Sequence, residues 1–190
     1  MLYGQIHLTL PAWIHQEVDG ERAYPDDDSK IALAIQLARR NVELGSGGPF
    51  GAAVFDGAGR VLGVGVNRVV PQTCSVAHAE MMAFMAAQQR TQQFRLNDPQ
   101  GGLAGPIVLA TSAQPCCMCY GASFWAGLDE LLIAARAEDV MELTEFDEGP
   151  LPNDWRGELE RRGVRVRTDL MRAAGRDVLR DYAEHGGRRY

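Results

Sequence analysis

Long apolar runs are missing from this sequence of 190 residues. No stretch approaches the roughly 18 consecutive apolar residues that a membrane-spanning helix needs, so we expect no membrane association. The first residues also lack the basic segment and the following apolar segment that mark a secretory signal. Cysteine is scarce, with 4 in the chain, and Cys116, Cys117 and Cys119 lie close together. Such clustered thiols predict metal or redox chemistry in the reducing cytoplasm, where disulfides are rare.

An excess of positive charge is absent as well. The net charge is −6, from 19 lysines and arginines against 25 aspartates and glutamates. The arginines of the last third are interleaved with acidic residues, which is typical of a solvated surface with mixed ion pairs. A nucleic-acid-binding protein presents clustered positive charge instead. The sequence therefore argues against a nucleic-acid partner.

Helix and strand patterns alternate along the chain. With 46% hydrophobic and 23% charged residues, the composition is that of a globular protein, and the length suits one domain. Residues 1–25 are a lead-in of unassigned structure, and residues 26–190 are expected to form the domain. Periodicity and the lack of helix-breaking residues predict helices at about 28–44, 77–90 and 116–126, and a last helix from a Thr168 cap to 182. Apolar segments and turn residues predict strands at about 50–55, 60–67, 107–110, 131–134 and 164–166. A polar segment is expected before the last strand. This alternation predicts an α/β fold whose sheet has helices on both faces.

Two short motifs, each at the start of a predicted helix, carry the chemistry. His78-Ala79-Glu80 opens one helix, and Pro115-Cys116-Cys117-Met118-Cys119 opens another directly after a strand. Cys116 and Cys119 are three residues apart, so their sulfurs lie on one helix face. The helix N-terminus favours negative charge, which lowers a thiol pKa. One imidazole and two thiolates make a three-ligand Zn²⁺ site, whose open fourth position a catalytic zinc keeps for water.

Glu80 is the predicted proton carrier. It lies two residues after His78, so its carboxylate can reach a water molecule in the open position without binding the same ion. There it would take a proton from water and return it to a leaving amine. A His-x-Glu motif followed by Pro-Cys-x-x-Cys is the signature of zinc nucleobase deaminases.

Each motif also has a simpler interpretation. A structural zinc site would need a fourth protein ligand, for which Cys74 is the nearest candidate in the sequence. A thioredoxin-like redox pair is a second alternative, but it gives His78 and Glu80 no role. Cys117 points away from Cys116 on the helix, and core packing is its expected role.

A wider set of residues resembles the cytidine deaminase superfamily. Gly47-Gly48-Pro49-Phe50, Asn67, Ala77-His78-Ala79-Glu80 and Pro115 to Cys119 follow in the order and spacing of that family, over roughly residues 28–150. The resemblance implies a three-layer α/β/α fold with a mixed five-stranded sheet. It also implies a Zn²⁺ cofactor bound by His78, Cys116 and Cys119.

Within this superfamily the chain is most similar to bacterial guanine deaminases. The similarity rests on Asn67-Arg68-Val69-Val70, Phe124-Trp125-Ala126 and Phe146-Asp147-Glu148-Gly149-Pro150. It implies hydrolysis of guanine, a small-molecule nucleobase, to xanthine and ammonia. It further implies a homodimer in which a terminal aromatic residue closes the active site, often that of the partner subunit after a swap of C-termini.

The resemblance assigns roles to single residues. Glu148 would be a second proton carrier near the purine amine. The substrate-binding residues would include Ala79, with Asn67 hydrogen-bonded to the base, Phe50 and Trp125 flanking the ring, and Tyr190 closing the pocket. From the residues alone, Glu148 is expected to be solvated and the two ring-flanking aromatics to belong to the core. Asn67 would equally be a turn residue, and Tyr190 a frayed terminus.

The sequence departs from the family at two positions and leaves rival functions open. Cys117 stands where the family usually has Pro or Val, and Gln114 stands where Glu is common. A related pocket would accept cytosine, a nucleoside or an amino-triazine. A tRNA adenosine deaminase shares both motifs but must bind phosphates and extrude a base. The remaining alternative is a non-catalytic interaction module stabilised by a closed, four-ligand zinc site.

Overall fold

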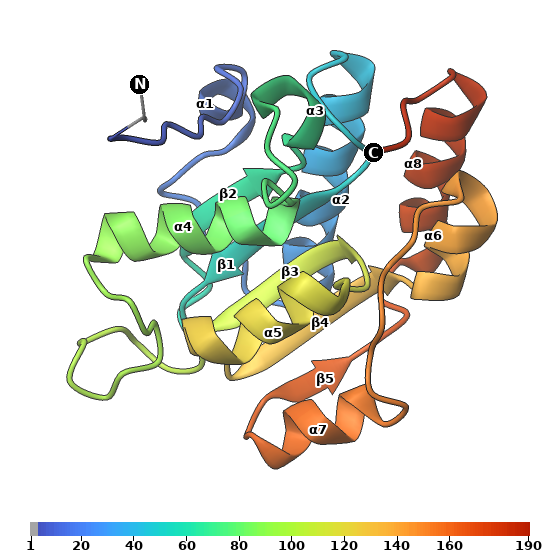
Figure 1. Ribbon diagram of the computed structural model, residues 1–190. Coiled ribbons are helices and arrows are strands. Elements are labelled where there is room, and N and C mark those ends of the chain that lie inside the picture. The colour runs from blue at the N-terminus through green and yellow to red at the C-terminus, as the bar shows by residue number, and fades with distance from the viewer. Residues whose placement is uncertain (1–3) are drawn as a thin grey trace.

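The computed structural model describes residues 4–190 as a mixed sheet between layers of helices (Figure 1). The five strands lie in the order β2-β1-β3-β4-β5. Their bounds are Gly51–Phe55 for β1, Val61–Val66 for β2, Val108–Ala113 for β3, Glu130–Ala135 for β4 and Arg165–Arg167 for β5. β1 is antiparallel to both β2 and β3, whereas β3, β4 and β5 run parallel. The expected five-stranded mixed sheet is therefore confirmed.

Helices cover both faces of this sheet (Figure 1). One face carries α2 (Asp27–Glu43) and α8 (Arg172–Glu184), with α6 (Ala137–Thr144) packed beside α8. The other carries α4 (Ala79–Thr91), α5 (Cys117–Ala126) and α7 (Trp155–Arg161). The short helices α1 (Ile14–Glu17) and α3 (Val69–Gln72) lie outside these layers. Within residues 4–190, no helix combines the length and apolarity needed to cross a bilayer.

The two apolar cores follow from strand geometry, because successive side chains of a strand point to opposite faces. Ala53 and Phe55 of β1 pack in the core under α2, while Ala52 and Val54 pack in the core under α4. All of these side chains are fully buried. β1 therefore reads as an almost continuous apolar segment, as expected for a strand with helices on both sides.

Gly65 of β2 brings the helix that begins at the His-x-Glu motif directly onto the sheet. A Cβ atom built at Gly65 would lie 1.9 Å from the carbonyl oxygen of Ala79 and 2.5 Å from the amide nitrogen of Ala83. Both neighbours are backbone atoms, which cannot rotate away. The lack of a side chain at this position therefore fixes how closely the start of α4 approaches β2.

The structure differs from the sequence-based expectation at three places. The polar segment expected before the last strand contains two short helices that were not expected, α6 and α7. The last helix begins at Arg172, with Met171 as its N-cap residue, so Thr168 does not cap it. The Thr168 hydroxyl instead donates to Asp169, whose φ of 67° turns the chain before α8. The lead-in contains α1, and its residues 1–3 lie outside the described part of the chain.

Candidate active site

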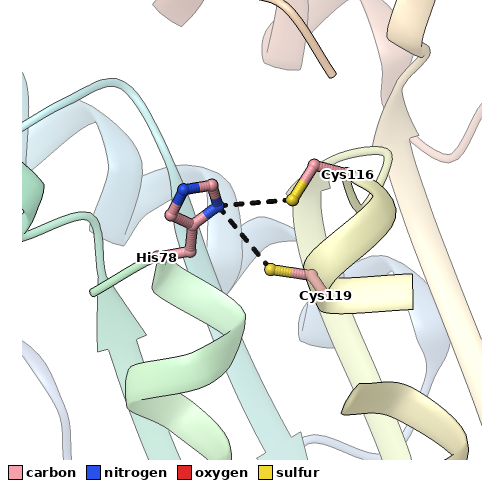
Figure 2. Close-up of side chains that lie close together, drawn as sticks. All are labelled: His78, Cys116 and Cys119. Carbon is pink, nitrogen blue, oxygen red and sulfur yellow. Dashed lines mark hydrogen bonds between the residues drawn. The ribbon is translucent and has the colours of Figure 1, made fainter. Parts of the chain in front are cut away.

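The first residues of α4 and α5 bring three candidate metal ligands together (Figure 2). His78 is the N-cap residue of α4, and Cys116 is the N-cap residue of α5, both with extended backbone angles. His78 Nδ1 lies 3.4 Å from Cys116 Sγ and 3.7 Å from Cys119 Sγ. The two motifs, separated in the sequence by a helix, a loop and a strand, thus meet at one point.

These distances fit a zinc ion. Zinc binds imidazole nitrogen at about 2.0 Å and thiolate sulfur at about 2.3 Å, so tetrahedral geometry separates the two ligands by about 3.5 Å. The three donor atoms all lie within 4.8 Å of one another. Among the described residues, this cluster is confined to His78, Cys116 and Cys119, and Cys74 is not part of it. The donor set is therefore that of an open, three-ligand site.

The protonation of the two thiols also suits a cation. Cys119 shares a hydrogen bond with Cys116, which together with the neighbouring His78 lowers the pKa of Cys116 to about 4 against the opposing effect of burial. The same hydrogen bond and burial raise the pKa of Cys119. Without a positive charge between them, one thiolate opposes ionisation of the other. A divalent cation would remove this penalty and allow both thiols to ionise.

A cavity of about 90 Å³ opens beside these ligands. The predicted site residues that line it are Phe50, Asn67, His78, Ala79, Glu80, Cys116, Glu148 and Tyr190. Gln114, Phe146 and Asp147 line it as well. Five parts of the chain thus line one cavity: the residue after β2, the starts of α4 and α5, the loop after α6 and the last residue.

Two carboxyl groups in this cavity have raised pKa values. Burial raises the pKa of Glu80 to about 7, and the Cys116 thiolate adds to this shift. Burial also raises the pKa of Glu148 to about 8, with further contributions from the negative charges of Cys116 and Glu80. Glu148 is half-buried rather than fully solvated, because the loop after α6 folds back against the start of α5. The backbone carbonyl of Glu148 accepts a hydrogen bond from the amide of Cys117, at 3.0 Å.

The amide of Asn67 has a defined orientation at the cavity wall. Its side chain is 1% exposed, and Oδ1 accepts a hydrogen bond from the amide of Val69, at 3.2 Å. The side-chain NH₂ group donates to the Tyr190 hydroxyl oxygen, which leaves one N–H of Asn67 for a ligand. Tyr190 reaches this side of the cavity, where burial raises the pKa of its hydroxyl and a hydrogen bond with Asn67 opposes the shift.

Aromatic rings form another wall. The ring centroid of Phe146 lies 5.7 Å from that of Phe50 and 4.7 Å from that of Tyr190. Phe146 is buried, and sequence reasoning did not assign it a role at the site. A single aromatic residue in an acidic stretch gives no signal of its own, and only the similarity of the segment 146–150 to the family drew attention to it.

Trp125 lies outside the cavity of its own chain. Its side chain is 75% exposed, and its ring packs against Phe124 with a centroid separation of 5.5 Å. From Cys119 to Trp125 the helix turns by about 600° and rises by about 9 Å, which directs Trp125 away from the sulfurs. The expectation that Trp125 flanks the substrate ring is thus not met within this chain. Cys117 is also exposed, beside Gly149, so the core role expected for it is wrong.

The candidate metal ligands lie in a part of the sequence that matches a known protein family. The family model described as the cytidine and deoxycytidylate deaminase zinc-binding region matches residues 25–135, more than half of the chain. The chain belongs to this deaminase family. It is accordingly an aminohydrolase with a zinc-binding deaminase domain, and the superfamily resemblance of its motifs is confirmed.

One curated relative and two solved structures make the similarity more specific. Guanine deaminase of Bacillus subtilis (strain 168) is 36% identical over 113 residues, which are 59% of this chain and 66% of the relative. A solved structure of guanine deaminase from Nitrosomonas europaea is 38% identical with a TM-score of 0.88, over 97% of this chain and 99% of that chain. The structure of NE0047 in complex with 2,6-diaminopurine is 40% identical with a TM-score of 0.89, over 97% of this chain and 95% of that chain. The deaminase is thus similar to guanine deaminases in sequence and in fold.

Proposed function

We propose that this deaminase hydrolyses guanine to xanthine and ammonia. The observation that carries the proposal is that the three zinc-ligand candidates, two buried or half-buried carboxyl groups and the Asn67 amide border one small cavity. Similarity to a guanine deaminase and to a structure that holds a diaminopurine supports the substrate class. Such a reaction belongs to purine catabolism.

His78, Cys116 and Cys119 would hold the zinc ion. When bound, zinc supplies a Lewis acid that lowers the pKa of a water molecule at its open position. The chain's own residues then orient the base and move protons. Glu80 is the group best suited to the first proton transfer, because it lies two residues after a ligand and faces the same cavity.

The proposed reaction consumes one water molecule. The water oxygen forms a bond to the ring carbon that carries the amine, and its proton passes to the Glu80 carboxylate. Glu80 delivers this proton to a ring nitrogen, and the second water proton passes to the amine through Glu80 or Glu148. The carbon–nitrogen bond then breaks, and ammonia leaves while the carbonyl of xanthine forms. Both carboxyl groups return to their starting protonation states.

The remaining cavity residues would select and enclose the base. One N–H of the Asn67 amide is available to donate to an acceptor on the purine, and Phe50 and Phe146 offer faces for the ring. Ala79 contributes a backbone amide of the first turn of α4, where helix amides have no intrahelical partner. Tyr190 closes the cavity and excludes bulk water, which strengthens electrostatic interactions inside.

We further propose that the enzyme is a cytoplasmic homodimer. The clustered free thiols at the site are suited to a reducing compartment. Exposed aromatic surface at Trp125, next to Phe124, supports a contact with a second copy. Tyr190 lines the cavity of the chain to which it belongs, and in a homodimer with swapped C-termini the same residue would close the cavity of the second copy.

Product analysis on the purified, zinc-loaded enzyme tests the function. Ammonia release would be measured with guanine, cytosine, a nucleoside, an amino-triazine and tRNA, with xanthine identified as the guanine product. We expect guanine to have the highest kcat/KM, and a chelator to abolish turnover until zinc is restored. Folded, zinc-loaded protein that releases no ammonia from guanine would reject the assignment. Turnover of tRNA with strongly salt-dependent binding would favour the adenosine deaminase instead.

A further inference from the structure

Asn41 is a fully buried polar residue in the last turn of α2, and its side chain contacts the backbone next to the candidate substrate-binding residues. Its Nδ2 donates to the carbonyl of Gly48 at 2.8 Å and to the carbonyl of Asn67 at 2.9 Å. The side chain is 0% exposed. Both donor hydrogens therefore fix backbone groups of two separate segments that line or flank the cavity.

Ser46 connects Asn41 to the N-terminal segment. The Ser46 hydroxyl donates to Asn41 Oδ1 at 2.7 Å and accepts a hydrogen bond from the indole Nε1 of Trp13 at 3.0 Å. Trp13 lies directly before α1, in the stretch to which sequence analysis gave no role. A continuous chain of hydrogen bonds thus runs from Trp13 through Ser46 and Asn41 to Asn67.

A second contact ties the same two segments together. The guanidinium of Arg68 donates through Nε to the carbonyl of Thr9 at 3.2 Å, and through another nitrogen to the carbonyl of Ser46. Burial lowers the pKa of Arg68, which remains a cation at neutral pH. Because Arg68 follows Asn67 in the chain, the N-terminal segment is joined to the substrate-binding strand end from two sides.

These hydrogen bonds hold the loop of residues 46–48, which packs tightly between Asn67 and Tyr190, two predicted substrate-binding residues. A Cβ atom built at Gly47 would lie 1.9 Å from the carbonyl oxygen of Asn67. A Cβ atom built at Gly48 would lie 2.1 Å from the hydroxyl oxygen of Tyr190. A shift of the loop by a fraction of an ångström would therefore move Asn67, Tyr190 or both.

We propose that Trp13, Ser46 and Asn41 form a positioning relay through which the N-terminal segment orients Asn67 for the base. None of the three touches the reacting atoms, so they are positioning residues. The proposal rests on the proposed function, in which Asn67 binds the substrate. It gives the part of the N-terminal segment around Trp13 a role in positioning the substrate, beyond covering the core.

The test uses the full-length, zinc-loaded enzyme and steady-state kinetics with guanine. Trp13→Phe removes the indole N–H and keeps an aromatic ring, whereas Ser46→Ala removes the central hydroxyl. We expect each variant to raise KM by about 3–10-fold, the loss expected for one hydrogen bond, with a smaller change in kcat. Ser46→Thr, which keeps a hydroxyl, should restore KM to within about 2-fold.

A double-mutant cycle separates a relay from two unrelated stabilising contacts. If the indole acts through Ser46, Trp13→Phe combined with Ser46→Ala should raise KM no more than the stronger single variant. Gln36→Ala is the matched control. Gln36 also binds the N-terminal segment, through Glu17 at 2.8 Å, but it does not contact Ser46. This variant should leave KM unchanged even if it lowers Tm.

The outcomes are distinguishable from failure of the proposed function. If the wild type releases no ammonia from guanine, the function is wrong. If the wild type is active and the two single variants are folded and zinc-loaded but keep the wild-type KM, the relay is wrong. Multiplicative KM effects in the double variant, or a rise in KM for Gln36→Ala equal to that for Trp13→Phe, would also overturn it.

Discussion

Glu80 and Glu148 face one cavity from different sides, and the negative charge of Glu80 helps to raise the pKa of Glu148. Glu80 comes from the first turn of α4, whereas Glu148 comes from the loop after α6. When two carboxyl groups disfavour each other's ionisation, one keeps its proton over a pH range in which the other is ionised. The electrostatic coupling of Glu80 and Glu148 therefore supports separate roles, with Glu80 accepting the first proton and Glu148 assisting the later transfer to the amine.

Glu80→Gln should abolish most of the activity while leaving the zinc site intact. The amide cannot accept the proton from water, so we expect kcat to fall by about 10²–10⁴-fold. Zinc content, measured by atomic absorption, and Tm should stay close to the wild-type values. If this variant kept full turnover, the protein would have to be regarded as a zinc-stabilised module, with its activity arising elsewhere.

Glu148→Gln should have a smaller effect than Glu80→Gln. Glu80 can still move the first proton, so we expect kcat to fall by about 10–100-fold at an unchanged zinc content. Glu138→Gln is the matched control, because it makes the same chemical change at an exposed position of α6 that does not line the cavity. Stopped assays of xanthine formation would measure all three enzymes. An equal loss of activity in Glu148→Gln and Glu138→Gln would indicate a general charge effect rather than a role of Glu148.

Gly65→Ala should displace the start of α4, because the new methyl group would meet backbone atoms of Ala79 and Ala83. We expect a loss of about 1–3 kcal/mol in the free energy of unfolding, together with weaker zinc binding. Gly121→Ala is the control, since no atom lies within 4 Å of a Cβ built at that helical glycine. It should be neutral or stabilising by up to about 1 kcal/mol. Urea unfolding and a zinc-competition titration would measure both. A Gly65→Ala protein as stable as the wild type would show that α4 is free to shift.

Asp139 should contribute stability that is lost in acid. Its side chain is 1% exposed and accepts hydrogen bonds from Arg172 at 2.6 and 2.7 Å, which hold its pKa well below the usual range. A carboxyl group with a lowered folded-state pKa stabilises the protein above its unfolded pKa of about 4, and this contribution disappears as the pH falls further. Asp139→Asn should therefore cost about 2–4 kcal/mol at pH 7, and the difference from the wild type should shrink below about pH 4.

Thermal unfolding across this pH range would check the prediction. Asp181→Asn is the control, because Asp181 pairs with Arg39 at the surface, with 45% of its side chain exposed. Its loss should cost less than about 1 kcal/mol. A constant difference between Asp139→Asn and the wild type from pH 7 to pH 3 would contradict the assigned role of the buried ion pair.

The sequence predicted the elements that carry the metal ligands because their signals are local. The helices predicted at about 77–90 and 116–126 match α4 and α5 to within two residues, and the ligand spacing follows from helix geometry. α6 was not predicted from the sequence because it packs on α8 rather than on the sheet. Its few apolar residues are interleaved with acidic ones, so the segment reads as polar. Asp139 illustrates this, since an acidic residue in an acidic stretch gives no sign that two arginines from α8 will bury it.

The roles of the remaining site residues depend on tertiary contacts that spacing cannot reveal. Trp125 and Phe50 both match family motifs, yet only Phe50 lines the cavity, because the face on which a side chain lies depends on helix rotation and packing. Asn41 looks like an ordinary polar residue of an amphipathic helix. Its buried contacts with Gly48 and Asn67 depend on how the following loop folds back, which no local pattern encodes.

The absence of a side chain at Gly48 has a consequence for the range of molecules that the enzyme accepts. A methyl group at Gly48 would collide with the Tyr190 hydroxyl and displace the Tyr190 ring away from the cavity. We expect the cavity of about 90 Å³ to become wider and more exposed to water in such a variant, which would make room for larger substrates. We therefore expect the close contact between this loop and Tyr190, far from the metal ligands in sequence, to contribute to selectivity for free bases.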